Sequence, residues 1–84
     1  NNEDPDVRVT AVRALGEMGE RTPVHILVAA LQDSDWQVRE MAIFALGKLE
    51  DSIPEGALEN MLDDESEFVR MAATETLKMI RGEK

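Results

Sequence analysis

The sequence has no cysteine and no tyrosine, and its 84 residues include only one histidine, one tryptophan and two phenylalanines. Without cysteine the chain can form no disulfide, no cysteine-ligated zinc site and no thiolate nucleophile. The lack of cysteine also favours a reducing compartment, and on that ground we expect a cytoplasmic location. Cysteine chemistry is therefore excluded as a source of function.

Long apolar segments are also absent. Apolar runs such as residues 26–31 are far shorter than the roughly 20 residues that a membrane-spanning helix needs. The N-terminal sequence N-N-E-D-P-D is acidic, whereas a signal peptide begins with basic residues. We therefore expect no contact with a membrane. Because the chain starts at Asn1 within a repeating pattern, we interpret it as a piece of a longer protein.

Basic residues are scarce, since 9 lysines and arginines stand against 18 acidic residues and give a formal net charge of −9. Nucleic acids and anionic membranes bind clustered cationic surfaces, so we expect neither as a partner. A protein partner of basic or mixed charge remains compatible with this composition. The negative charge also has a simpler use, which is to keep a small helical domain in solution.

The same sequence pattern occurs three times at an interval of 31 residues. The copies are D-P-D-V-R-V-T-A-V-R-A-L-G at residues 4–16, D-S-D-W-Q-V-R-E-M-A-I-F-A-L-G at 33–47 and D-E-S-E-F-V-R-M-A-A-T-E-T-L-K at 64–78. The interval also aligns the segments between these blocks, since it pairs Pro23 with Pro54. Each repeating unit is therefore longer than one helix.

Within each copy the apolar residues recur at the spacing of an amphipathic helix, as in Val38, Ala42, Ala45, Leu46 and Leu49. Each copy has a good N-cap residue at the same repeat position, just before its predicted helix, namely Asp4, Asp35 and Ser66. A shorter second helix in each unit is indicated by Thr22-Pro23 and by the capping-box sequence Ser52-Ile53-Pro54-Glu55. We predict five helices with short antiparallel connections, over residues 5–18, 23–32, 36–49, 54–63 and 67–81.

The run D-x-D-x-x-V-R-x-x-A-x-x-A-L-G, which residues 33–47 match in full, resembles the HEAT repeat. A period of 31 residues is similar to that of the compact HEAT-like repeats named after phycobilisome lyases. The resemblance implies an all-α fold, an α-solenoid of antiparallel helix pairs. It divides the single domain of residues 1–84 into a half repeat at 4–18 and repeats at 23–49 and 54–81. The third copy departs from the pattern at Ser66, Thr76 and Lys78. We expect that the array either ends at this copy or packs more loosely there.

An arginine follows the inward-facing valine in every copy, at Arg8, Arg39 and Arg70. This position lies about 100° round the helix from the valine, where the stem can cover apolar surface while the guanidinium reaches out. Candidate acceptors are carbonyl groups at helix ends and the turn acids Asp33, Asp35 and Asp64. The family resemblance implies a ladder of such bonds between repeats, and we assign the three arginines to it as structural residues, together with Asp35 and Asp64.

No residue shows the pattern of a catalytic, cofactor-binding or metal-binding site. His25 lies away from the apolar stripe of its helix, and the residues three and four positions on, Val28 and Ala29, cannot complete a metal pair. The acids at residues 63–67 lack the glycine and the ligand spacing of a calcium loop, and acids are common near helix N-termini. The glycines form no phosphate-binding loop. We therefore predict that the chain is not an enzyme and binds no cofactor.

Large apolar residues interrupt the otherwise polar outer face of the repeated helix. One interpretation is that these residues are singly exposed, or are covered by curvature of the array or by a neighbouring helix. The other is a partner-contact patch, an aromatic surface with an acidic rim, made of Trp36, Glu40, Phe44, Phe68, Met71 and Glu75. The second interpretation predicts that these residues are exposed together.

A stacked array leaves an extended outer surface for recognition, so we expect a non-catalytic protein-interaction or scaffold module that binds a protein or peptide. One alternative is a segment of a larger enzyme such as a bilin lyase, because the resemblance is to repeats named after lyases. Another is a purely structural spacer. The pattern also allows self-association, since the inner side of residues 7–18 has no leading helix to cover it.

Overall fold

The computed structural model describes residues 4–49 and 52–82. Over these residues the chain forms four α-helices and no strand. They are α1 (Pro5–Gly16), α2 (Val24–Ala30), α3 (Trp36–Gly47) and α4 (Glu67–Arg81), and the 3₁₀-helices η1 (Gly19–Arg21) and η3 (Glu59–Asp63) lie between them. The predicted all-α class is confirmed. None of the described helices is long and apolar enough to cross a membrane.

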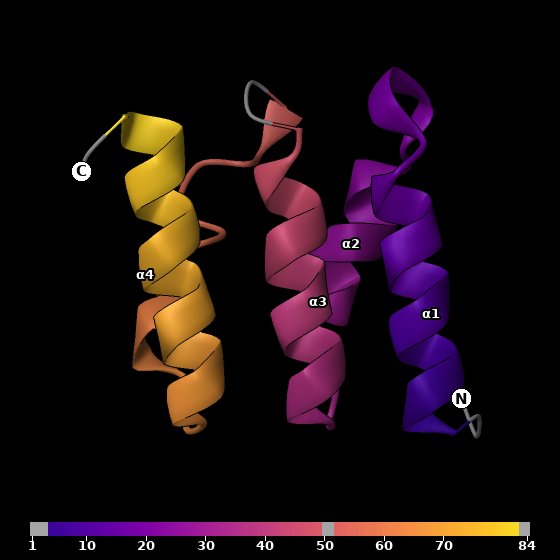
Figure 1. The fold of residues 1–84 in the computed structure, drawn as a ribbon, viewed down its shortest axis with the longest axis horizontal. Helices are drawn as coiled ribbons and strands as arrows, with labels where there is room; N and C mark the ends of the chain where they lie inside the picture. The colour runs from indigo at the N-terminus through magenta and orange to yellow at the C-terminus, as the bar shows by residue number, and fades with distance from the viewer. Residues whose placement is uncertain (1–3, 50–51, 83–84) are drawn as a thin grey trace.

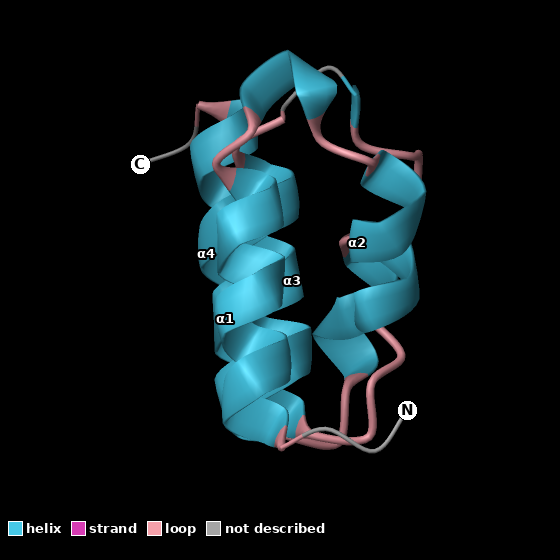
Figure 2. Cartoon of the chain, turned by 90° about the vertical axis from the view of Figure 1, so that its right-hand side faces the viewer, coloured by secondary structure: helices cyan, strands magenta, loops and turns pink. Residues whose placement is uncertain are grey.

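The helices form two layers. α1, α3 and α4 lie side by side in chain order (Figure 1), and α2 lies in a second layer behind them (Figure 2). α2 packs against α3 and α1, while η3 packs against α4. The shortest dimension of the molecule, 18 Å, corresponds to two layers of helices about 10 Å thick. Each element of the second layer thus lies behind the helix that follows it in sequence.

The three long helices begin at the predicted N-cap residues. The carboxylate of Asp4 accepts a hydrogen bond from the backbone N–H of Asp6 at 2.8 Å, and Asp35 accepts one from Gln37 at the same distance. Ser66 accepts a longer bond, 3.5 Å, from the backbone N–H of Val69. These local bonds satisfy backbone donors that have no partner within the helix. They fix where each helix starts, and therefore the register of its outer face.

The segment predicted as a helix over residues 54–63 forms differently. Residues 55–58 are turns, and a 3₁₀-helix follows from Glu59. Gly56 has a φ of +82°, in the left-handed region, which an α-helix cannot include. The same repeat position in α2 is His25, whose backbone is helical. Gly56 thus permits the turn that stands where the capping-box sequence beginning at Ser52 predicted an α-helix.

Other helix boundaries differ by one or two residues from the predictions. α1 and α3 both end at the glycine of the pattern, Gly16 and Gly47, rather than two residues later. α2 begins at Val24, and Thr22 does not cap it, because the Thr22 hydroxyl donates to the carbonyl of Leu15 at 2.8 Å. Thr22 therefore joins the end of α1 to the start of the second layer.

The core lies between the two layers. Its largest fully buried side chains are Leu27, Ile43, Leu46, Leu58, Val38 and Val69. Val7 occupies the same repeat position as Val38 but is 54% exposed, against 1% for Val38. The difference arises because α2 lies behind α3 and η3 behind α4, whereas no described element precedes α1. Equivalent positions of the repeat thus differ in burial according to whether an element of the second layer covers them.

Candidate functional site

Two arginines of the repeat form matching bonds to the next unit. The Nε and Nη2 groups of Arg8 donate to the carboxylate of Asp33 at 2.9 and 3.0 Å. Those of Arg39 donate to the carboxylate of Asp64 at the same two distances. Each bond pair spans 25 residues, and each guanidinium binds its carboxylate through two parallel bonds, the strongest arrangement for such a pair. The bonds connect α1 and α3 to the turns before α3 and α4.

The ladder also uses backbone carbonyl groups. Arg39 donates from Nη1 to the carbonyl of Asp33 at 2.8 Å, and Arg70 donates from Nη1 to the carbonyl of Asp64 at 2.7 Å. The structure does not support the predicted role of Asp35 in the ladder, because the carboxylate of Asp35 caps α3. Asp33, two residues earlier, is the acid that binds Arg8. Asp33 was among the candidate turn acids, and both acids of an Asp-x-Asp turn are equally plausible from sequence alone.

Burial and hydrogen bonding act in opposite directions on the carboxylates of the ladder. Burial by itself raises the pKa of Asp33 and of Asp64. The hydrogen bonds from Arg8 and Arg39, those from the backbone N–H groups of Asp35 and Ser66, and the nearby guanidinium charges outweigh that effect. The pKa of each acid is therefore held below its ordinary value, and both stay ionised in the folded chain.

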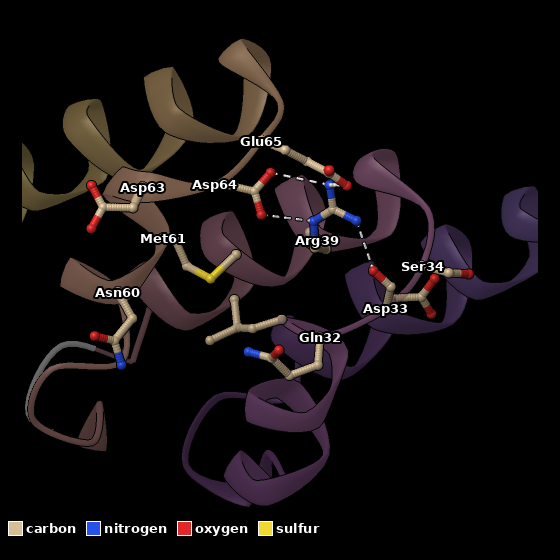
Figure 3. A pocket seen from close by; sticks show the side chains of 10 residues that line it. Gln32, Asp33, Ser34, Arg39, Asn60, Met61, Asp63, Asp64 and Glu65 are labelled. Carbon is tan, nitrogen blue, oxygen red and sulfur yellow. Dashed lines mark hydrogen bonds and ion pairs between the residues drawn. The ribbon is translucent and has the colours of Figure 1, made fainter.

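A polar hollow of about 550 Å³ lies at the turns, and Arg39, Asp33 and Asp64 of the ladder are among its lining residues (Figure 3). Arg39 lies between Asp33 and Asp64 and points toward both, while the exposed Glu65 lies 4.0 Å from its Nη2. The guanidinium is thus already engaged by the chain itself. Within residues 4–49 and 52–82 there is no group of three or more histidines and acids that could hold a metal ion. The bonds in this hollow connect α3 to the turn before α4.

A second depression lies between α3 and α4, and we call it the α3/α4 groove. It has a volume of about 200 Å³ and is lined by Glu40, Phe44, Phe68, Met71, Ala72 and Glu75. Five of these residues belong to the predicted partner-contact patch. Phe44, Phe68 and Met71 are 42%, 51% and 60% exposed, so the apolar side chains are accessible together. The structure therefore brings together residues from two successive repeats.

Trp36, the sixth residue of the predicted patch, does not line the groove. Its ring stacks on that of Phe68, with the centroids 4.9 Å apart and the planes at 24°. It is partly buried against the core, at the start of α3. Trp36 therefore contacts Phe68, a residue of the groove lining, without lining the α3/α4 groove itself. The pair joins the first residue of α3 to the first turn of α4.

Ala72 lines the groove but was not predicted. It is 4% exposed and lies one helical turn after Phe68. Its small side chain leaves the space that the larger residues surround. The i, i+4 relation to Phe68 could have indicated it, but an alanine on a helix that is rich in alanine carries little signal.

The groove has acids at its edges and no base among its lining residues. Glu40 is partly buried, and burial raises the pKa of its carboxyl group. Within the described chain neither Glu40 nor Glu75 forms a side-chain hydrogen bond or an ion pair. Their charges are therefore available to a group from outside. His25, by contrast, lies exposed on α2, away from the groove lining.

Comparison with known proteins agrees with the repeat pattern. The family model described as HEAT repeats matches residues 1–78, which include all three copies of the pattern. No curated protein matches the chain. The match thus extends over both layers and over the residues that line the groove.

Proposed function

The chain belongs to the HEAT-repeat family, and from this premise we propose that it is a non-catalytic protein-interaction or scaffold module. HEAT repeats generally mediate contacts between proteins. We propose that the α3/α4 groove, together with Trp36, which stacks on Phe68, is the contact surface. The observation that carries the proposal is the gathering of Phe44, Phe68 and Met71 from two repeats into one exposed depression.

The composition of the groove supports a polypeptide partner. Aromatic residues and methionine are enriched at the centres of protein interfaces, and charged residues lie at their rims. The groove has that arrangement, since Phe44, Phe68 and Met71 surround Ala72 and the acids Glu40 and Glu75 stand beside them. Its volume of about 200 Å³ is below the range of roughly 300–1,000 Å³ that is usual for small-molecule sites. Side chains of a larger partner suit it better.

The repeat division supports a finer placement of the chain. We propose that it belongs to the compact branch of the family, with a half repeat at residues 4–18 and repeats at 23–49 and 54–81. The 31-residue period and the two ladder bonds of equal span are consistent with this placement. The period does not by itself assign a lyase activity, because the resemblance lies in the scaffold.

The experiment that tests the function compares three forms of the protein in affinity purification with quantitative mass spectrometry. Phe44→Glu places a charge in the groove and is expected to reduce recovery of a specific partner at least about tenfold. Met79→Glu is the matched control, because Met79 is 71% exposed on α4 and lies outside the groove lining. It should recover the partner as the unaltered chain does. Equal recovery by all three forms would remove the groove as the contact surface.

A further inference from the structure

Within residues 4–49 and 52–82, Glu40 and Glu75 of the α3/α4 groove form no ion pair with a basic side chain. Arg8 and Arg39 bind acids of the ladder, Arg70 bonds a backbone carbonyl, and Arg81 forms an ion pair with Glu59 at 3.0 Å. No lysine or arginine lines the groove. Glu40 lies partly buried beside an aromatic surface without a compensating charge. Partial burial disfavours the charged form of this carboxyl group, and a cation supplied from outside would favour it.

We propose that the α3/α4 groove receives one arginine or lysine side chain of a partner polypeptide. The aliphatic stem lies along Phe44, Phe68 and Met71, and the charged head lies near Glu40 and Glu75. This inference rests on the proposed function, because it names the chemistry that the same groove selects.

Two physical arguments favour a cation over an apolar side chain. Covering Glu40 with an apolar residue would bury its charge further without a partner, whereas a guanidinium or ammonium group would pair with it. The faces of Phe44 and Phe68 also attract a cation, and long basic side chains combine an apolar stem with a charged head. The groove offers both surfaces side by side, since its lining is mainly apolar and its only charged residues are the two acids.

The size of the groove limits the occupant. A volume of about 200 Å³ is small for a drug-sized ligand and suits a single long side chain. The groove is also open rather than enclosed, because Phe68 and Met71 are more than half exposed. A backbone can therefore lie across the two helices while one side chain enters between them. The remaining contacts of the partner would lie on the surrounding outer face.

The experiment uses short acetylated and amidated peptides whose central residue is arginine, lysine, citrulline or norleucine between alanines. Binding to the full chain is followed by the methyl NMR signal of Met71 and the backbone signals of residues 40–44. We expect the arginine and lysine peptides to bind about tenfold more tightly than the citrulline and norleucine peptides. Comparison of the arginine and lysine peptides shows whether the groove prefers a planar guanidinium group or a compact ammonium group.

Matched variants assign the effect to the acids of the groove. Glu40→Gln and Glu75→Gln should each weaken binding of the arginine peptide severalfold and leave that of norleucine unchanged. Glu17→Gln removes the same charge outside the groove and should behave as the unaltered chain does. Circular dichroism melting of each variant confirms that it is folded.

The inference is overturned if norleucine binds as tightly as arginine, if Glu40→Gln and Glu75→Gln leave the preference intact, or if the arginine peptide does not bind at about 10 mM. In each of these cases the proposed function is judged separately. It stands if Phe44→Glu loses the partner that Met79→Glu retains, and the groove is then an apolar receptor. It fails if both variants retain that partner.

Discussion

Thr76 of α4 occupies the space in which a side chain at Gly47 of α3 would lie. A Cβ atom at Gly47 would be 2.6 Å from Cγ2 of Thr76, which is too close for carbon atoms. Gly16 stands in the same relation to Ala45, since a Cβ there would be 2.6 Å from the Ala45 Cβ. Each glycine thus lets its helix approach the next one closely. The threonine that departs from the repeat pattern at position 76 fills the second of these contacts.

This contact predicts that the effect of Gly47→Ala on the free energy of unfolding changes sign with the residue at position 76. In the unaltered chain the substitution should lower the free energy of unfolding by about 1–2 kcal/mol, because the clash exceeds the gain in helix propensity. In a Thr76→Ala background the nearest atom becomes the Cβ at position 76, 3.9 Å away, which is an ordinary contact. There Gly47→Ala should stabilise the chain by up to about 1 kcal/mol.

Urea unfolding of the four proteins in this double-mutant cycle measures the coupling between positions 47 and 76. Gly16→Ala provides a comparison, because its Cβ would also be 3.0 Å from the Ala45 Cα atom, a backbone atom that no side-chain substitution removes. If the two substitutions changed the free energy of unfolding additively, positions 47 and 76 would not be coupled. The helices α3 and α4 could then move apart without loss of stability.

The ladder predicts unequal effects for two arginines at the same repeat position. Arg39 and Asp64 are 9% and 11% exposed in their side chains, so Arg39→Ala leaves a largely buried carboxylate without its partner. We expect a loss of about 3 kcal/mol, or a Tm lower by ~15 °C. Arg70→Ala removes one bond to a carbonyl and should cost about 1 kcal/mol. Equal melting temperatures for the two variants would contradict a ladder held by Arg39 and Asp64.

The lowered pKa values of Asp33 and Asp64 predict how stability depends on pH. A carboxyl group whose pKa is lower in the folded chain stabilises it fully above its unfolded pKa, about 3.9, and this stabilisation is lost as the pH falls through the folded pKa. The free energy of unfolding should therefore be level near neutral pH and fall below about pH 4. Asp64→Asn should lower it by about 2 kcal/mol at pH 7 and make the acid decline shallower.

Thermal melts between pH 7 and pH 2 measure this decline. Asp63→Asn is the matched control, because Asp63 precedes Asp64 but forms no ion pair with an arginine in the described chain. It should keep the acid decline of the unaltered protein. A decline in Asp64→Asn as steep as in the unaltered chain would mean that the ladder acids do not govern acid unfolding.

Local signals in the sequence predicted much of the fold. The N-cap residues and the apolar stripes placed the three long helices, because both act within one or two turns of the chain. Gly56 shows where such reasoning fails, since its apolar neighbours kept the helical spacing while its backbone adopted a positive φ. A glycine permits that conformation without requiring it. The sequence therefore could not decide between an α-helix and a turn at residues 55–58.

The candidate site was predictable in position but not in shape. The outward columns of the repeat identified Phe44, Phe68 and Met71, because equivalent positions point the same way in a regular array. Within the patch, Trp36 stacks on Phe68 without lining the groove, whereas Ala72 lines it, and this division depends on how α3 and α4 pack together. Gly47 and Thr76 meet between these two helices, and no pattern within a single helix contains that contact.

The stacking of Trp36 on Phe68 predicts a spectroscopic effect that also tests the wall of the groove. Trp36 is the only tryptophan, so the emission of the protein reports on its surroundings alone. Phe68→Ala removes the ring that covers one face of the indole, and we expect a red-shifted emission with a stability loss of about 1 kcal/mol. Phe44→Ala is the control, because Phe44 lines the groove without stacking on Trp36 and should leave the emission maximum unchanged. If Phe44→Ala shifted the emission as much as Phe68→Ala, the indole would sense the whole groove, and Trp36 would have to belong to its lining.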